Sequence, residues 1–497
     1  MHTARRAVDT EPVISIAQRT LIVSGTRLLN RALIVISPII LARLLSVTDF
    51  GYYREFLLYV TMLAGFAAFG ISSSLLSFIP SAPAHGWRYV NQAVLMTLGS
   101  STLVAAGALL LNAAFGGNLL GEHPWAVVVY VWLFTNFDFW EPLLIAEKQP
   151  YRVWGYTTGR LLCRLVVVTV SAALTRDVAV IVWSLVGYEG LRMLISARAW
   201  HARNRAAGVG SSGAGTWREQ LRYCAPFGSA LIVAQLNASM GGLFVTKLLG
   251  PAALAQFSIG VYAQPIITVL RNSLSDVLLG EMAARRVQGQ DDLLSLWRRS
   301  TVVTALMLVP LGVILARFAD TIVVTLFSPA YQPAVIVFQL YVLALLRETF
   351  DFGIPLRALN RTAPILRTNL LAVVANIGLM AIMVPAWGLA GAAIAFVISK
   401  IIEGAYLASE VARALNLRPR DLARWSDLGK IVAAAAAAAG AVLFLPLWNG
   451  LLGVLAGSAV FSLTYLFLLR LARIPEVLIG LNRAQHYSRS LLARLQT

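Results

Sequence analysis

The sequence predicts an all-α, polytopic membrane protein with about 14 transmembrane helices. Apolar residues make up 58% of the 497 residues, charged residues only 13%, and the mean hydropathy is +0.73. A water-soluble chain of 53.8 kDa could not bury that much apolar side chain, whereas a membrane-spanning helix needs roughly 20 apolar residues. The apolar residues are also gathered into stretches of helix-spanning length, which are separated by short polar connections.

The distribution of Lys and Arg predicts how the helices are oriented. Most of the 41 Lys and Arg residues fall on alternate loops, or at the helix ends beside them, when the N-terminus is placed inside. Cytoplasmic loops carry this excess, so we expect a multi-pass protein of the inner (plasma) membrane with both termini in the cytoplasm. The net charge of +18 has the same origin, and we expect membrane lipids and no nucleic acid as partners.

The predicted helices follow one another with short connections. The first follows a polar segment with Arg5, Arg6 and Arg19, and it is too long to be a cleaved signal peptide. To within about 2–4 residues, the helices span 20–45, 52–79, 90–115, 125–147, 152–175, 178–200, 222–246, 252–281, 299–326, 333–354, 363–386, 388–412, 428–448 and 451–470.

Two polar breaks divide this series into parts. The Gly/Ser/Arg stretch from His201 to Glu219 is typical of a flexible cytoplasmic linker, and a basic connection runs from Leu415 to Asp427. We therefore expect four parts: an N-terminal lobe of six helices (1–200), the linker (201–219), a C-terminal lobe of six helices (220–414), and helices 13 and 14 with a cytoplasmic tail (415–497).

The two six-helix lobes look like degenerate copies of one another. The segment ARLLSVTDFGYY (Ala42 to Tyr53) corresponds to TKLLGPAALAQF (Thr246 to Phe257), and EPLLIAEKQP (Glu141 to Pro150) corresponds to IPLRALNRTAP (Ile354 to Pro364). Because each lobe has an even number of helices, the copies run in the same sense about an axis along the membrane normal. Pairs of this kind bind substrate between the halves and work by rocking.

Arginines within the predicted spans indicate an anionic guest. An ionised side chain at the centre of a span costs about 2.5–3.5 kcal/mol, so it should face protein or a wet cavity. Arg27 and Arg31 share one face of helix 1, and Arg160 and Arg164 share one face of helix 5. Neighbouring like charges repel one another, whereas phosphate or pyrophosphate is a natural ligand for an arginine cluster.

The remaining charges within the spans have two interpretations. Asp138 and Glu141 on helix 4, and Glu189 beside Arg192 on helix 6, could be ion-pair partners of the arginines or could couple a proton or sodium ion. With Arg192 the positive charges of this half exceed the negative ones. In the second half, Arg271 and Asp276 lie on helix 8, and structural ion pairs are the favoured interpretation of Arg347, Glu348, Asp351, Lys400 and Glu403.

Several classes of enzyme and cofactor site are not indicated. The two cysteines, Cys163 and Cys224, imply no disulfide framework, and the five histidines have no metal-ligand spacing. The longest predicted outer loop runs only from Gly116 to Pro124, whereas membrane polymerases and ligases that act on outer-face glycans need a sizeable outer loop. With no nucleotide-binding or hydrolase motif, the sequence predicts a transporter without a cofactor.

The short segment ARLLSVTDFGYY, together with the helix count and the two halves, resembles a known family. It is similar to the polysaccharide and O-antigen flippases of the multidrug/oligosaccharidyl-lipid/polysaccharide exporter superfamily. The residues that carry the resemblance are Ala42, Arg43, Leu44, Leu45, Asp49, Phe50, Gly51 and Tyr52. This chain has Ser46-Val47 where Gly-Pro is usual in the family, whereas the second copy keeps Leu249, Gly250 and Pro251.

The resemblance implies a fold and an activity. The expected fold is two lobes around a central cavity, with helices 13 and 14 appended. The expected activity is translocation of an undecaprenyl-pyrophosphate-linked oligosaccharide for exopolysaccharide, O-antigen or capsule, with polymerase and chain-length or export machinery as partners. Relatives also place cavity arginines on helices 1, 2 and 8, which here correspond to Arg27, Arg54 and Arg271.

Three other functions stay open from the sequence. A cation-coupled drug exporter of the same fold would need an acidic cavity, and the positive excess argues against it. A membrane glycan polymerase or ligase would need catalytic residues on outer loops. An assembly scaffold would tolerate uncharged residues at Arg27 and Arg31.

Overall fold

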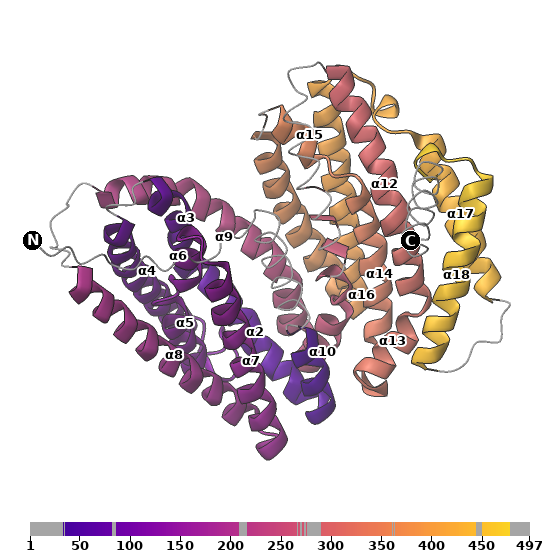
Figure 1. Ribbon diagram of the computed structural model, residues 1–497. Coiled ribbons are helices and arrows are strands. Elements are labelled where there is room, and N and C mark those ends of the chain that lie inside the picture. Colours follow the sequence, from indigo (N-terminus) through magenta and orange to yellow (C-terminus); the bar gives the residue numbers. More distant parts are fainter. Residues whose placement is uncertain are drawn as a thin grey trace, which may run out of the picture. The chain divides into compact units, whose positions relative to one another are not determined.

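The computed structural model describes residues 33, 35–81, 86–207, 216–265, 267–268, 271–272, 275, 290–359, 361, 363–443 and 450–477. Every regular element in this part of the chain is a helix (Figure 1), which confirms the predicted all-α class. Among the described residues, eight helices are long and apolar enough to cross a membrane. The protein is therefore a multi-pass membrane protein.

The chain forms two compact units. Unit 1 comprises Met1–Leu44 and Tyr59–Leu231, and unit 2 comprises Leu45–Leu58 and Ile232–Thr497. The chain passes from one unit to the other within two helices, α2 (Val47–Ala68) and α9 (Thr216–Leu249).

Unit 1 is a bundle in which α4, α5 and α8 lie side by side (Figure 1). Helix α7 packs on α8, and α3 packs on α4 and on the short helix α6. Proline at the first position starts α5 and α7, where its missing N–H costs nothing. Besides the shared helices, the elements are α3 (Ile71–Ser81), α4 (Gly86–Ala114), α5 (Pro124–Thr135), α6 (Trp140–Ala146), α7 (Pro150–Thr175) and α8 (Val178–Ala207).

Unit 2 is built around α14, which packs against α10, α12 and α16. The long element α16 holds two helices, because Gly388 lies at φ +56° and turns the chain where the boundary between helices 11 and 12 is predicted. The elements are α10 (Pro251–Gly260), α12 (Gln290–Arg317), α13 (Ala319–Leu326), η2 (Pro329–Tyr331), α14 (Ala334–Leu346), η3 (Arg347–Thr349), α15 (Gly353–Ala358), α16 (Ala363–Ala414), η4 (Pro419–Asp421), α17 (Trp425–Leu443) and α18 (Leu451–Leu471).

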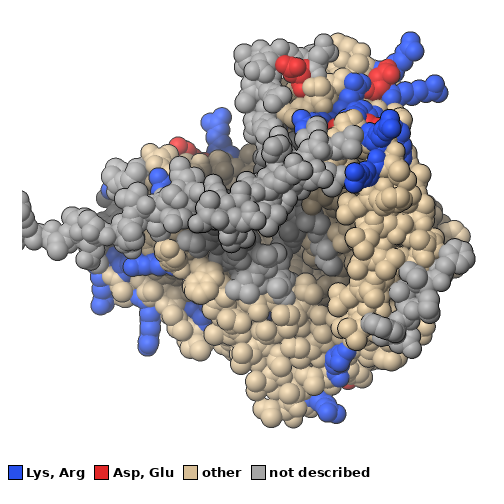
Figure 2. All heavy atoms as spheres, turned by 45° about the vertical axis from the view of Figure 1, so that its right-hand side comes forward, with Lys and Arg blue, Asp and Glu red and all other residues tan. Residues whose placement is uncertain are grey.

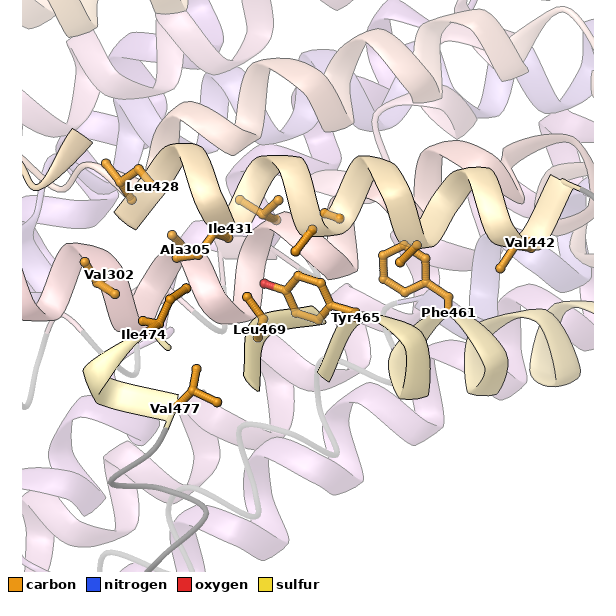
Figure 3. Packing of buried hydrophobic residues seen from close by; sticks show 14 of the residues in the cluster. Val302, Ala305, Leu428, Ile431, Val442, Phe461, Tyr465, Leu469, Ile474 and Val477 are labelled. Atoms are coloured by element: carbon orange, nitrogen blue, oxygen red, sulfur yellow. The ribbon is translucent and has the colours of Figure 1, made fainter. Parts of the chain in front are cut away.

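The last two helices of unit 2 are docked on α12 by an apolar core. Phe461 and Tyr465 of α18 lie between α17 and α18, and Ile431 of α17 faces Ala305 of α12 (Figure 3). Arg424, just before α17, forms an ion pair with Asp427 and a second one, at 2.5 Å, with Glu476. These contacts make the two helices an integral part of unit 2.

Charged side chains are segregated on the surface. In Figure 2 charged side chains gather at the upper right and a few lie at the lower edge, with residues of other kinds between these two places. Large apolar side chains such as Leu103, Leu174 and Leu463 are 70–79% exposed. In a bilayer these exposed faces contact lipid, so their exposure costs nothing.

Four of the predicted helices are each made of two pieces. Predicted helix 2 consists of α2 and α3, helix 4 of α5 and α6, helix 9 of α12 and α13, and helix 10 of α14 and α15. Periodicity and hydropathy do not detect such breaks, because apolar residues continue on both sides of each break. Two of the breaks organise the charged residues described next.

Candidate functional site: two charge clusters at broken helices

The break between α5 and α6 exposes backbone carbonyls inside unit 1. Phe137 adopts a left-handed φ of +57°, so helical hydrogen bonding stops there. Asn136 is fully buried and ends α5 because its backbone is extended (ψ 139°); its side-chain Nδ2 donates to the carbonyl of Trp132 at 2.8 Å. The carbonyls of the last turn are left without helical partners and must be satisfied by other donors.

Arg192 of α8 supplies those donors. Its Nη2 donates to the carbonyls of Leu133 at 2.7 Å, Phe134 at 2.8 Å and Asn136 at 3.2 Å. Its Nε lies 2.5 Å from Oε2 of Glu189, and these two side chains are only 7% and 1% exposed. The guanidinium therefore joins a broken helix to a buried carboxylate.

Arg160 of α7 completes this group of charges. Its Nη1 lies 2.5 Å from Oδ1 of Asp138, which stands in the break, and its Nη2 lies 3.9 Å from Glu189. The guanidinium also lies 5.0 Å from the ring centroid of Phe134. We call Asp138, Arg160, Glu189 and Arg192 the unit 1 cluster; its two positive and two negative charges balance.

A second cluster lies at the break between α14 and α15 in unit 2. Arg271 bonds Glu348 at 2.9 Å, Arg347 bonds Glu403 at 3.2 Å, and Lys400 bonds Glu403 at 2.8 Å. We call Arg271, Arg347, Glu348, Asp351, Lys400 and Glu403 the unit 2 cluster. The more exposed Arg357 lies 3.9 Å from Asp351 and gives the group one positive charge in excess. The ion pairs expected for these residues are present.

Asp351 has in unit 2 the place that Asp138 has in unit 1. Its Oδ2 accepts a hydrogen bond from Ser275 at 2.7 Å and lies 3.8 Å from Arg271. Its Oδ1 accepts from the backbone N–H of Gly353 at 3.1 Å, which starts α15. This carboxylate thus orients the short helix after the break.

The two breaks carry the same sequence motif. Phe137-Asp138-Phe139 and Phe350-Asp351-Phe352 are identical, and each lies just before a segment already matched between the halves. Glu189-Gly190 and Glu403-Gly404 then follow at nearly the same distance along the chain. At Gly404 a Cβ atom would lie 2.8 Å from Nε of Arg347, so the glycine makes room for the arginine.

The phenylalanines of this motif pack on tryptophans in both units. In unit 1, Phe139 lies 4.9 Å from Trp140 and 6.3 Å from Trp87. In unit 2, Phe352 lies 5.6 Å from Trp297, whose Nε1 donates to the carbonyl of Asp351. At each break the aspartate therefore lies beside arginine side chains, and the phenylalanines pack into an aromatic core. The shared Phe-Asp-Phe motif is the signal that could have located both sites in the sequence.

Of the ten predicted site residues, the structure gathers Arg160, Arg192, Asp138 and Glu189 in unit 1 and places Arg271 in unit 2. Glu141 and Arg164 are half-buried on α6 and α7 and make interactions of their own. Arg27 and Arg31 lie outside the described residues, as does Asp276.

Arg54 of α2 has a different environment. Its Nη1 lies 3.4 Å from the hydroxyl of Tyr262, and its guanidinium lies 5.8 Å from the ring centroid of that tyrosine. Its buried Nε has no hydrogen-bond acceptor among the described residues, and no carboxylate of that part of the chain forms an ion pair with it. Among all the described residues, no three His, Cys, Asp or Glu side chains lie close enough together to hold a metal ion.

These features define a class of protein: a multi-pass helical membrane protein in which each of two units holds a cluster of ion pairs at a broken helix. The chain belongs to a polysaccharide biosynthesis protein family, whose model matches residues 40–336. The family resemblance seen in the sequence is thereby confirmed. None of the curated proteins matches the chain significantly.

Solved structures share the fold. A structure titled as the lipid II flippase MurJ in an inward closed conformation superposes with a TM-score of 0.64 at 14% identity, covering 90% of this chain and 98% of that one. An inward-facing multidrug resistance MATE family transporter of the MOP superfamily gives 0.58 at 14% identity, covering 78% and 95%. A mutant MATE transporter of Vibrio cholerae gives 0.52 at 14% identity, covering 80% and 96%.

Proposed function

We propose that this protein is a flippase that moves an undecaprenyl-pyrophosphate-linked oligosaccharide from the inner to the outer leaflet of the inner membrane. The proposal depends on the family of the chain taken together with its fold. The chain belongs to a polysaccharide biosynthesis family, and nine-tenths of it adopts a fold found in a structure titled lipid II flippase. We expect the polar head to cross through the protein while the lipid tail stays in the bilayer.

Arg54 is the described arginine best suited to bind the pyrophosphate. It lies in an apolar span, and its contacts are the hydroxyl and ring of Tyr262. An arginine without a carboxylate partner gains the most from an incoming anion, because no internal ion pair has to be broken. Arg27 and Arg31 stay predicted contacts on the sequence argument.

The clustered arginines support a different role in the same function. Arg160, Arg192 and Arg271 each lie within 4 Å of a carboxylate, so their charges are already neutralised. We expect these three arginines to position the broken helices and not to be the first residues that bind the substrate. Coupling of a proton or sodium ion through Asp138, Glu141 or Glu189 stays a prediction.

The test follows the lipid-linked repeat unit in a strain that lacks the protein. We expect the unit to accumulate on the inner leaflet and mature polysaccharide to be lost. Arg54→Gln, and separately Arg27→Ala with Arg31→Ala, should reproduce this defect at normal protein levels. Arg317→Gln, at an exposed arginine on α12, is the matched control and should behave like the wild type.

Other outcomes would assign another function. If the repeat unit reaches the outer leaflet at the normal rate without the protein, flipping is done elsewhere and the proposal fails. Loss of resistance to cationic compounds in that strain would then indicate a drug exporter. Unpolymerised repeat units on the outer leaflet would indicate a polymerase or a scaffold.

A further inference from the structure

A hollow on the surface of unit 1 lies at the end of a membrane span. It has a volume of about 670 Å³ and lies along the last turns of α8; the described residues that line it are Leu194, Ala197, Arg198, Trp200, His201, Ala202 and Arg205. The apolar span that contains α8 runs from Val178 to Arg205, so the hollow is at the depth where hydrocarbon gives way to headgroups. It lies at the end of α8 predicted to be cytoplasmic.

The lining changes from apolar to basic along the helix. Leu191, Leu194 and Ile195 are 58–60% exposed and would contact acyl chains. Arg198 lies one turn further, and His201 and Arg205 follow on the same face at helical spacing. The order matches a phospholipid, in which the acyl chains are followed by the phosphate.

The two arginines of the hollow have no ionic partner among the residues that the structure describes. No acidic side chain of the described residues forms an ion pair with Arg198 or Arg205. Arg203 lies between them in sequence but points elsewhere: it pairs with Glu147 at 3.6 Å and lies 5.2 Å from the ring centroid of Trp140. The two arginines of the hollow are thus available to an external anion.

One aromatic residue of the lining is held in place. Trp200 is half-buried, and its Nε1 donates to Oδ1 of Asn91 at 2.8 Å, so its ring is fixed in orientation. Asn91 in turn donates to Asn204 at 2.9 Å. A fixed aromatic ring between apolar and basic groups is the usual arrangement at a membrane interface.

We propose that this hollow binds the headgroup of an anionic phospholipid of the inner leaflet, with Arg198, His201 and Arg205 on the phosphate and Leu194 beside the acyl chains. The site is separate from the proposed transport function, since it concerns a bulk membrane lipid. An anionic headgroup would balance the positive charge of a hollow that is lined by both basic and apolar residues. A zwitterionic lipid would leave that charge unbalanced.

The test is native mass spectrometry of the full chain in detergent, titrated with phosphatidylglycerol or phosphatidylcholine. The variant R198Q/R205Q should lose affinity for phosphatidylglycerol on the order of tenfold, with phosphatidylcholine unchanged. R361Q/R367Q removes two exposed arginines from the predicted inner end of another helix and should change the affinity less than about twofold. R198K/R205K should restore most of the affinity, because a headgroup phosphate accepts a point charge.

An equal loss in both glutamine variants would overturn the proposal, because the effect would then be one of net charge. Unchanged affinity of R198Q/R205Q for phosphatidylglycerol would overturn it as well. In a third arm, undecaprenyl pyrophosphate replaces the phospholipid. If R198Q/R205Q loses affinity for undecaprenyl pyrophosphate alone, the hollow does not bind phospholipid and is assigned to the lipid-linked substrate. None of these results depends on whether the protein flips its substrate.

Discussion

At the scale of single residues, several buried ions of the two clusters have more than one partner. Arg192 is the extreme case, since one guanidinium serves a carboxylate and three backbone carbonyls. Removing it would leave the carboxylate of Glu189 and a helix end without donors in a place that water hardly reaches.

We therefore expect Arg192→Ala to destabilise the purified protein by about 3–5 kcal/mol. Thermal unfolding in detergent, followed by tryptophan fluorescence, measures the change. Arg192→Lys should be intermediate, because one ammonium cannot replace the planar fork of donors. Arg152→Ala, at an exposed arginine of α7, is the control. A loss no larger than that of the control would show that Glu189 and the carbonyls are satisfied in another way.

Gly51 belongs to the short family-like segment and has a clear steric role. A Cβ atom at this position would overlap the carbonyl oxygen of Pro251, where α2 meets the start of α10 within unit 2. Gly51→Ala should therefore destabilise the protein by at least about 1–3 kcal/mol. Gly107→Ala is the matched control, because nothing lies within 4 Å of its Cβ position. Equal melting temperatures of the two variants would contradict this close approach.

At the scale of elements, each half of the chain uses an interrupted helix to place charges inside a membrane. In unit 1 the interruption supplies carbonyls that Arg192 binds. In both units it turns one aspartate toward arginine, and the flanking phenylalanines hold the break in an aromatic core. Non-helical backbone at membrane depth is stable only when protein groups satisfy it in this way. Both breaks share the Phe-Asp-Phe motif and an aspartate that lies within 4 Å of an arginine.

We expect the aromatic cores at the two breaks to contribute to the stability of the protein to a similar degree. Phe139 and Phe352 are 2% and 8% exposed, so Phe139→Ala and Phe352→Ala should each cost about 3–5 kcal/mol. Thermal unfolding measures both. Trp125→Ala, at a tryptophan that is 64% exposed, should have little effect. If only one of the two phenylalanine variants is destabilised, the breaks are not equivalent.

At the scale of the whole molecule, the charge distribution predicts an orientation that can be measured directly. In a background without Cys163 and Cys224, we expect Glu122→Cys to react with a membrane-impermeant maleimide on intact cells. Arg418→Cys should react only after the membrane is permeabilised. Both positions are exposed, so accessibility to the reagent is not limited by the protein itself. The reverse labelling pattern would place the termini outside.

Much of the architecture can be predicted from the sequence for a physical reason. In a bilayer, each spanning segment must be apolar and about 20 residues long, so the sequence alone indicates the all-α class, the multi-pass character and the family. The boundary between helices 11 and 12 was also predictable, and it coincides with the turn at Gly388.

The partners of the charged residues were decided only by the tertiary structure. From spacing, Arg160 and Arg164 suggested an anionic guest, yet Arg160 bonds Asp138 in the preceding broken helix. Arg192 pairs with the nearby Glu189 but also donates to backbone carbonyls of α5, 56–59 residues earlier in the chain. Hydropathy cannot show this, because it reports how a segment partitions into lipid and not which helices meet. Local sequence thus determines which segments enter the membrane, whereas long-range packing determines which charges neutralise one another and which, like Arg54, have no carboxylate partner among the described residues.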